Sequence, residues 1–172
     1  MPIAVPVLSP RQRSGAPRRA QGTGGVASPL RSMLDLSAAT RAVAAEPLLA
    51  PAVAALQREA CRLTRSTDAT VVTVDWEHGT TWTLDGSVMS DEVRELVARV
   101  AGSGQRELFG HALVEPIGSA PARAVIALRR PAADRFTRDD IALVSALVGG
   151  VAATLNRLIG ARVAVAGLSG RP

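Results

Sequence analysis

The chain has 172 residues, and 47% of them are hydrophobic, which is enough for one domain with a buried core. Its formal net charge is +5, but five of its twenty arginines precede the first acidic residue, Asp35, and the other fifteen equal the fifteen acidic residues. The positive charge therefore belongs to the N-terminal segment. This distribution argues against a nucleic-acid-binding face on the folded part and allows only a weak contact by that segment.

Cysteine content and hydropathy exclude further classes of protein. Cys61 is the single cysteine, so an internal disulfide and a cysteine-based metal site are excluded, which is typical of a reducing cytosol. No apolar run approaches the roughly 18 residues that a membrane-spanning helix needs. Lysine is absent while alanine, glycine and arginine abound, which favours a GC-rich bacterial genome. We therefore expect a cytoplasmic bacterial protein without a membrane span.

The beginning of the chain is predicted to be a tail followed by two helices. Residues 1–34 are rich in proline, glycine and arginine without a hydrophobic period, so we predict a disordered basic tail. The domain is predicted to span residues 35–160, with a lead-in helix from Asp35 to about Ala45 and a longer helix that starts near Pro51. Apolar residues of the longer helix recur at steps of four and three: Leu49, Val53, Leu56, Ala60 and Leu63. Residues 161–172 are predicted to form a flexible C-terminal tail.

A β-hairpin is predicted next. Residues 69–77 are rich in β-branched side chains and alternate, with Val72, Val74 and Trp76 expected on one face. A turn at His78 and Gly79 leads to a second strand over residues 80–84. We expect Trp76 and Trp82 to lie near one another across the hairpin, either as core packing or as the wall of an aromatic pocket.

A third helix and three strands follow. Ser90 begins a helix with Val93, Leu96, Val97 and Val100 on one stripe, and Gly102 is expected to end it. Short strands are predicted over residues 106–109 and 111–116, and a longer one over residues 123–130, whose last two arginines we expect to be solvated. Strands of this kind, alternating with helices, predict an α+β domain: an antiparallel sheet with helices packed on it.

The last predicted helix runs from about Ile141 to Ile159. Thr137 is a good N-cap, and Asp139 and Asp140 place negative charge at the positive end of the helix dipole. The helix is apolar on more than one side, so it must be buried on more than one side, most simply against a second copy. The interface of this homodimer is predicted to use the stripes of the two long helices: Val53, Leu56, Ile141, Val144, Val148, Val151, Leu155 and Leu158.

The sequence offers no constellation of catalytic residues. His78 lies in the expected hairpin turn, and His111 begins a strand, where it can face a pocket. Two histidines in separate loops without carboxylates at ligand spacing do not predict a metal site. We therefore predict that the protein is not an enzyme and needs no metal or cofactor.

Several motifs resemble those of the GAF domain family over about residues 48–160. These are Val114-Glu115-Pro116-Ile117, the strand at residues 124–128, and Phe136-Thr137-Arg138-Asp139-Asp140 before the last helix. The resemblance implies that the first and last helices pack together on one face of the sheet and across a dimer. It also implies a ligand pocket on the opposite face, and a regulatory or sensory role.

The chain departs from the family pattern in ways that bear on a ligand. The segment between Leu84 and Gln105 is short, which predicts a small or shallow pocket. The Asn-Lys-Phe-Asp-Glu motif of cyclic-nucleotide-binding members is absent, and no cysteine lies in the central pocket region, which excludes bilin attachment. If a small molecule binds, we expect it to contact Phe109, His111 and Val114, together with Val97 of the preceding helix.

The chain ends soon after the last helix, so a signal is expected to pass to a separate protein such as a kinase or transcription regulator. The same order of helices and strands also describes roadblock and profilin-like modules. The alternative function is therefore a dimeric scaffold for a GTPase or another partner.

Overall fold

The computed structural model describes residues 29–84, 86 and 89–169. The helices and strands follow one another in the predicted order: α1 (Pro29–Ala44), α2 (Leu49–Thr64), β1 (Asp68–Asp75), β2 (Thr80–Thr83), α3 (Asp91–Ser103), β3 (Glu107–Phe109), β4 (Ala112–Pro116), β5 (Ala124–Arg129) and α4 (Arg138–Ser169). The strands form one antiparallel sheet in the order β2-β1-β5-β4-β3. The predicted α+β class is confirmed.

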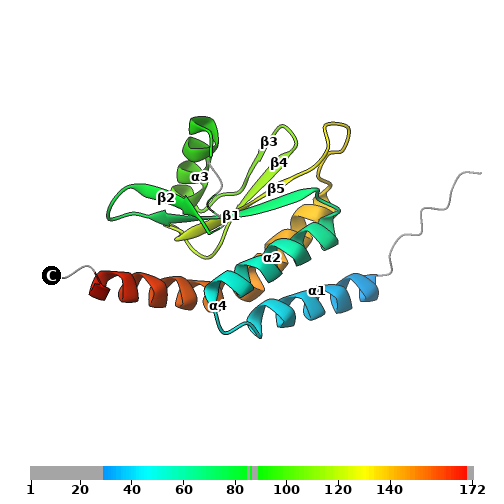
Figure 1. Cartoon of the computed structure of the whole chain (residues 1–172). Helices are drawn as coiled ribbons and strands as arrows, with labels where there is room; N and C mark the ends of the chain where they lie inside the picture. The colour runs from blue at the N-terminus through cyan, green and yellow to red at the C-terminus, as the bar shows by residue number, and fades with distance from the viewer. Residues whose placement is uncertain (1–28, 85, 87–88, 170–172) are drawn as a thin grey trace, which may run out of the picture.

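The molecule is layered, as Figure 1 shows. Helix α3 covers one face of the sheet, α2 and α4 cover the other, and α1 lies on the outer side of α2 and α4. The alternation of β1 divides the core accordingly. Val71 faces the large core shared with α1, α2 and α4, whereas Val72 and Val74 face a smaller core beneath α3.

The two tryptophans lie on opposite faces of the sheet, so the predicted pair across the hairpin is wrong. Trp82 is the partner of Thr73 in β1 and packs against the large core, with the guanidinium of Arg162 4.9 Å above its ring centroid. Trp76 donates its indole N–H to the carbonyl of Ala122 at 2.9 Å, and it lies against α3. The error arises because Trp82 pairs with Thr73, whose side chain lies on the opposite face of β1 from that of Trp76.

Three helix ends differ from the prediction. Helix α1 begins at Pro29 rather than Asp35, and proline is well suited to a first helical turn; residues 1–28 of the predicted tail lie outside the described residues. Helix α4 continues to Ser169 instead of ending near Ile159, because Gly160 lowers helix propensity without stopping the helix. Helix α3 is capped by Ser90 as predicted, but its left-handed C-cap is Gly104 rather than Gly102.

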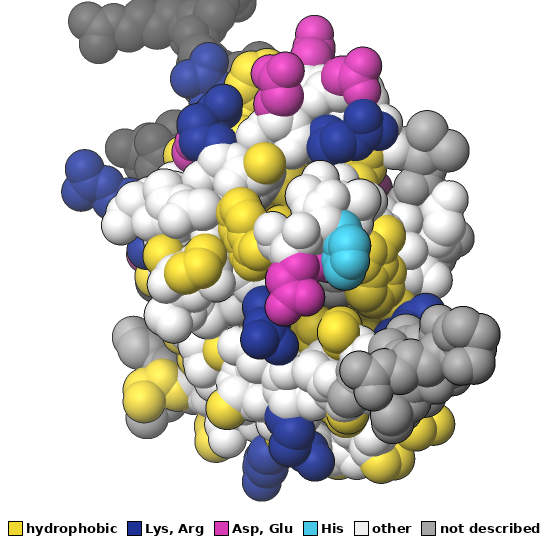
Figure 2. Space-filling view, turned by 90° about the vertical axis from the view of Figure 1, so that its left-hand side faces the viewer, with side chains coloured by type: hydrophobic (Ala, Val, Ile, Leu, Met, Phe, Trp, Pro, Cys, Tyr) yellow, Lys and Arg dark blue, Asp and Glu magenta, His cyan; other side chains and the backbone are white. Residues whose placement is uncertain are grey.

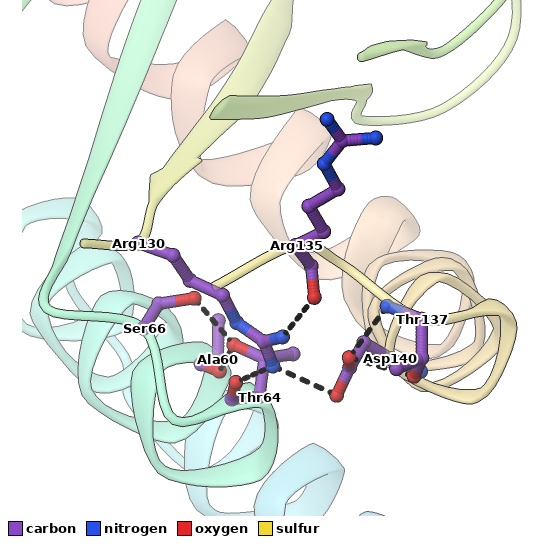
Figure 3. Close-up of polar contacts among 7 residues, drawn as sticks. All are labelled: Ala60, Thr64, Ser66, Arg130, Arg135, Thr137 and Asp140. Atoms are coloured by element: carbon purple, nitrogen blue, oxygen red, sulfur yellow. Dashed lines mark hydrogen bonds and ion pairs between the residues drawn. The ribbon is translucent and has the colours of Figure 1, made fainter. Parts of the chain in front are cut away.

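Arg130, expected to be solvated, is instead buried where the sheet meets the two long helices. Its side chain is 9% exposed and forms an ion pair with Asp140 of α4 at 2.9 Å. It also donates to the carbonyl of Thr64 at the end of α2 and, at 2.8 Å, to the carbonyl of Arg135. Figure 3 shows these contacts converging on one guanidinium, which lies 4.6 Å from the ring centroid of Phe136. Arg130 therefore ties β5, α2 and α4 together.

The start of α4 is held by a reciprocal cap. The backbone N–H of Asp140 donates to the hydroxyl of Thr137 at 3.2 Å, and both the N–H and the hydroxyl of Thr137 donate to the Asp140 carboxylate. This arrangement is a capping box in which aspartate takes the usual place of glutamate. The predicted N-cap role of Thr137 is confirmed, and the cap fixes the carboxylate that Arg130 binds.

The side chains predicted to form a dimer interface are buried inside one chain. Seven of them are between 0% and 8% exposed, and Ile141 packs partly buried against the same core: Val53, Leu56, Val144, Val148, Val151, Leu155 and Leu158. The structure contradicts this interface, because the sheet and α1 already cover the two stripes. Dimerisation remains a prediction that needs a different surface.

By length and composition alone, residues 138–163 of α4 could span a membrane.

Glu115 is a buried carboxylate between β4 and α4. It is 7% exposed, accepts a hydrogen bond from the Ser145 hydroxyl at 2.8 Å, and lies 3.6 Å from the Arg106 guanidinium. Burial raises the pKa of Glu115, although the Ser145 hydrogen bond and the Arg106 charge oppose the rise. The folded state therefore binds a proton at Glu115 more readily than the unfolded chain does.

Removing the Arg130 guanidinium should weaken the fold substantially. In Arg130→Met the Asp140 carboxylate loses a buried partner, so we expect the free energy of unfolding to fall by about 3–5 kcal/mol in urea titrations. The neighbouring Arg129→Met, at an exposed position, should change it by less than about 0.5 kcal/mol. Equal stability of the two variants would show that Arg130 does not tie the layers together.

The raised pKa of Glu115 predicts a pH-dependent effect of its neutral analogue. The contribution of Glu115 to stability is fully present below its unfolded pKa, about 4.3, and is lost as the pH rises through the higher folded pKa. Between pH 4 and 7, the melting temperature of Glu115→Gln should therefore rise relative to that of the wild type, as measured by circular dichroism in matched buffers. A difference independent of pH would contradict the raised pKa.

Candidate functional site

A pocket of about 850 Å³ lies between the sheet and the N-terminal half of α3. This volume is within the range of small-molecule sites in proteins. The side chains that shape it come from four strands, α3 and three connections: Asp68, Thr70, Val72, Met89, Ser90, Val93, Leu96, Phe109, His111, Ala112, Val114, Ala127, Arg129 and Ala132. The pocket is therefore on the sheet face opposite α2 and α4.

The strand register sorts the floor of the pocket into rows of different polarity. At the end of the sheet, Asp68 in β1 and Arg129 in β5 are partners. In the next row toward the middle of the sheet, Thr70 of β1 is the partner of Ala127 of β5. In the row after that, β1 contributes Val72. The floor thus changes from charged at its outer end to apolar beneath α3.

The walls continue this gradient. Helix α3 contributes Val93 and Leu96 above the apolar end, and its N-cap Ser90 accepts a hydrogen bond from the N–H of Val93 at 3.4 Å. The end of β3 contributes Phe109, which is 62% exposed, and the turn that follows contributes His111. A ligand in this pocket would meet an apolar interior and polar groups mainly at the rim.

The structure brings three of the four predicted ligand contacts to this pocket. Phe109, His111 and Val114 line it. Val97 does not, because it is 0% exposed within the small core beneath α3; the nearby Val93 and Leu96 face the pocket instead. The prediction for Val97 is wrong because one stripe of α3 serves both the core and the pocket.

The pocket is larger than the short segment between Leu84 and Gln105 predicts. Its outer wall is supplied by the β3–β4 turn and by Ala132, in the connection between β5 and α4. Asp68, Thr70 and Arg129 were not predicted as lining residues. The strand alternation that places Val72 on the α3 face would have placed Asp68 and Thr70 there too.

His111 connects the pocket to the Arg130 ion pair. Its backbone carbonyl accepts a hydrogen bond from the Arg130 N–H at 3.0 Å. Its side-chain Nδ1 is buried and has no hydrogen-bond partner among the described residues. One end of the pocket is therefore one hydrogen bond away from the residue that holds α2 and α4.

His78 takes no part in this site. The end of the sheet with the β1–β2 turn faces the viewer in Figure 2, where a histidine lies beside an acidic side chain. His78 Nδ1 is 2.8 Å from the Asp75 carboxylate, and this hydrogen bond raises the pKa of His78, whose side chain is 73% exposed. The predicted role as a turn residue agrees with this geometry. Among the described residues, no cluster of three potential metal ligands is present.

No family model matches the sequence, and no curated protein matches it. Several solved structures are similar to this chain. The GAF domain of the potassium sensor histidine kinase KdpD from Escherichia coli has a TM-score of 0.61 and 15% identity, over 77% of this chain and 99% of that one.

Two further structures are GAF domains of phosphoenolpyruvate-protein phosphotransferases. The one from Coxiella burnetii has a TM-score of 0.62 and 15% identity, covering 77% of this chain and 98% of its own. The one from Acinetobacter has a TM-score of 0.61 and 8% identity, covering 74% and 94%. Identities this low establish the fold alone. The chain therefore has the fold of a GAF domain, as its last strand and helix predicted.

Proposed function

We propose that this protein is a non-enzymatic regulatory domain of the cytoplasm that binds a small molecule, homodimerises and relays a signal to a separate partner protein. The observation that carries the proposal is the pocket of about 850 Å³ with an apolar interior and a polar rim. The similar GAF domains belong to a sensor kinase and to phosphotransferases, which supports a regulatory role.

The position of the pocket supports a relay to the helices. A ligand that moves the β3–β4 turn would pull on the hydrogen bond between the His111 carbonyl and the Arg130 N–H. The side chain of Arg130 in turn contacts the end of α2 and the start of α4. A bound ligand would therefore shift the relative position of the two long helices. A partner protein, such as a kinase or transcription regulator, that contacts these helices would respond to the shift.

The exposed flank of α4 supports dimerisation through a new surface. Residues 141–156 contain no charged side chain, and only a third of the most apolar stretch of the helix is buried within the chain. Ala142, Ala146, Gly149 and Ala153 are exposed at helical spacing. Small residues let a second helix approach closely, so this flank suits a symmetric contact between two copies of α4.

Filling the pocket should abolish ligand binding without unfolding the protein. In a thermal-shift screen of metabolites, we expect at least one compound to raise the melting temperature of the wild type. The larger side chain of Ala127→Leu lies in the middle row of the floor, so it should remove that shift. As a matched control, Ala98→Leu on the exposed side of α3 should keep it. A screen without any hit would favour the alternative, a scaffold that works without a ligand.

Charges on the exposed flank of α4 should dissociate the dimer. We expect the wild type to sediment as a dimer and Ala146→Glu with Ala153→Glu to sediment as a monomer with an unchanged circular dichroism spectrum, because like charges repel across a symmetric contact. Ala98→Glu on α3 is the control and should remain dimeric. A wild type that stays monomeric at high concentration would refute the dimer.

A further inference from the structure

The outer end of the pocket carries two opposite charges on neighbouring strands. Asp68 and Arg129 are cross-strand partners, so their Cα atoms are about 4.5–5.5 Å apart and both side chains emerge on the α3 face. Neither side chain forms an ion pair or hydrogen bond with another described residue. Both residues are exposed, so each charge is accessible from the pocket.

Nearby groups do not neutralise these two charges. Arg130 also borders the pocket, but its guanidinium is committed to Asp140. The Cys61 thiol is near Asp68, and its pKa is raised first by burial and then by that carboxylate. The pocket rim therefore presents one free carboxylate beside one free guanidinium.

From this juxtaposition we infer that the pocket binds a small zwitterion with an apolar side chain, of the class of the aliphatic α-amino acids; the inference rests on the proposed ligand-binding function. An α-ammonium beside Asp68 and an α-carboxylate beside Arg129 match two unlike charges held close together. A simple anion would place its charge next to the Asp68 carboxylate, and a simple cation would place its charge next to the Arg129 guanidinium. The zwitterion alone satisfies both residues.

The rest of the floor fits the side chain of such a ligand. Rows on one face of a strand are about 6.8 Å apart, because successive residues rise about 3.4 Å. An aliphatic side chain that starts at the charged row therefore extends toward Ala127 in the next row, in the direction of the apolar end of the floor. These contacts are apolar, so they favour a branched hydrocarbon over a polar or charged side chain.

Isothermal titration calorimetry with three related compounds tests the inference. L-leucine carries both charges, 4-methylpentanoate lacks the amine, and 3-methylbutylamine lacks the carboxylate. We expect L-leucine to bind the wild type and the other two to bind at least about tenfold more weakly, since each loses one charge-assisted contact.

Variants assign each charge to its partner. Asp68→Asn should weaken L-leucine at least about tenfold but not 4-methylpentanoate, whereas Arg129→Met should weaken both. Arg123→Met is the matched control, because Arg123 is exposed next to the opposite end of β5, outside the pocket, and its variant should bind as the wild type does. Circular dichroism of each variant verifies that it is folded.

The outcomes separate this inference from the proposed function. If 4-methylpentanoate binds as tightly as L-leucine, or if leucine binding survives both Asp68→Asn and Arg129→Met, the zwitterion is wrong. If L-leucine does not bind while another metabolite gives a shift that Ala127→Leu removes, the ligand class is wrong and the pocket function stands. If no compound binds, both are wrong.

Discussion

The arrangement of the layers depends on the buried guanidinium of Arg130. A charged side chain that is only 9% exposed is costly to the fold unless it is paired and hydrogen-bonded. Asp140 and the carbonyls of Thr64 and Arg135 supply those partners, and they come from α4, from α2 and from the segment between β5 and α4. The Nε of Arg130 has no hydrogen-bond partner among the described residues, so the contacts of its two terminal nitrogens fix where α2 ends and α4 begins relative to the sheet. The same residue reaches the pocket through its own backbone N–H, so the pocket and the helices share one anchor.

The polarity of the pocket follows from strand register rather than from any single motif. Asp68 opposes Arg129 at the end of the sheet, and the positions two residues further on, Thr70 and Ala127, are smaller and less polar. A shift of β1 by one residue against β5 would turn Asp68 toward α2 and α4 and bring Ala69 to the pocket. The buried Ala69 and Leu128 prevent such a shift, because they belong to the large core. Core packing on one face thus determines the chemistry on the other.

Features that depend on nearby residues were predictable from the sequence, and features that join distant segments were not. The capping box of Thr137 and Asp140 lies within four residues, and the strands near residues 71 and 126 carry their own alternation. By contrast, Arg130 and Thr64 are 66 residues apart, and no local pattern distinguishes a buried arginine from a solvated one. Three of the four residues predicted to contact a ligand, Phe109, His111 and Val114, line the pocket, and all three lie in strands that the sequence predicts. Asp68 was not predicted because the expected strand began one residue later, at residue 69, whereas β1 begins at Asp68.

The stripe on α4 shows why an apolar pattern does not reveal its partner. Val144, Val148 and Leu155 have the spacing of a subunit interface, which indicates that this face of α4 is buried. The sequence cannot say whether a second copy or another part of the same chain supplies the cover. Here α1 supplies part of it, and Gly150 permits the close approach: a Cβ at this position would lie 3.0 Å from a Thr40 methyl. What α4 leaves open is the flank of alanines and Gly149, which is uncharged but made of small side chains. A contact formed there would rest on the close fit of two helix backbones rather than on large buried side chains, which suits an interface that a shift of α4 can loosen or tighten.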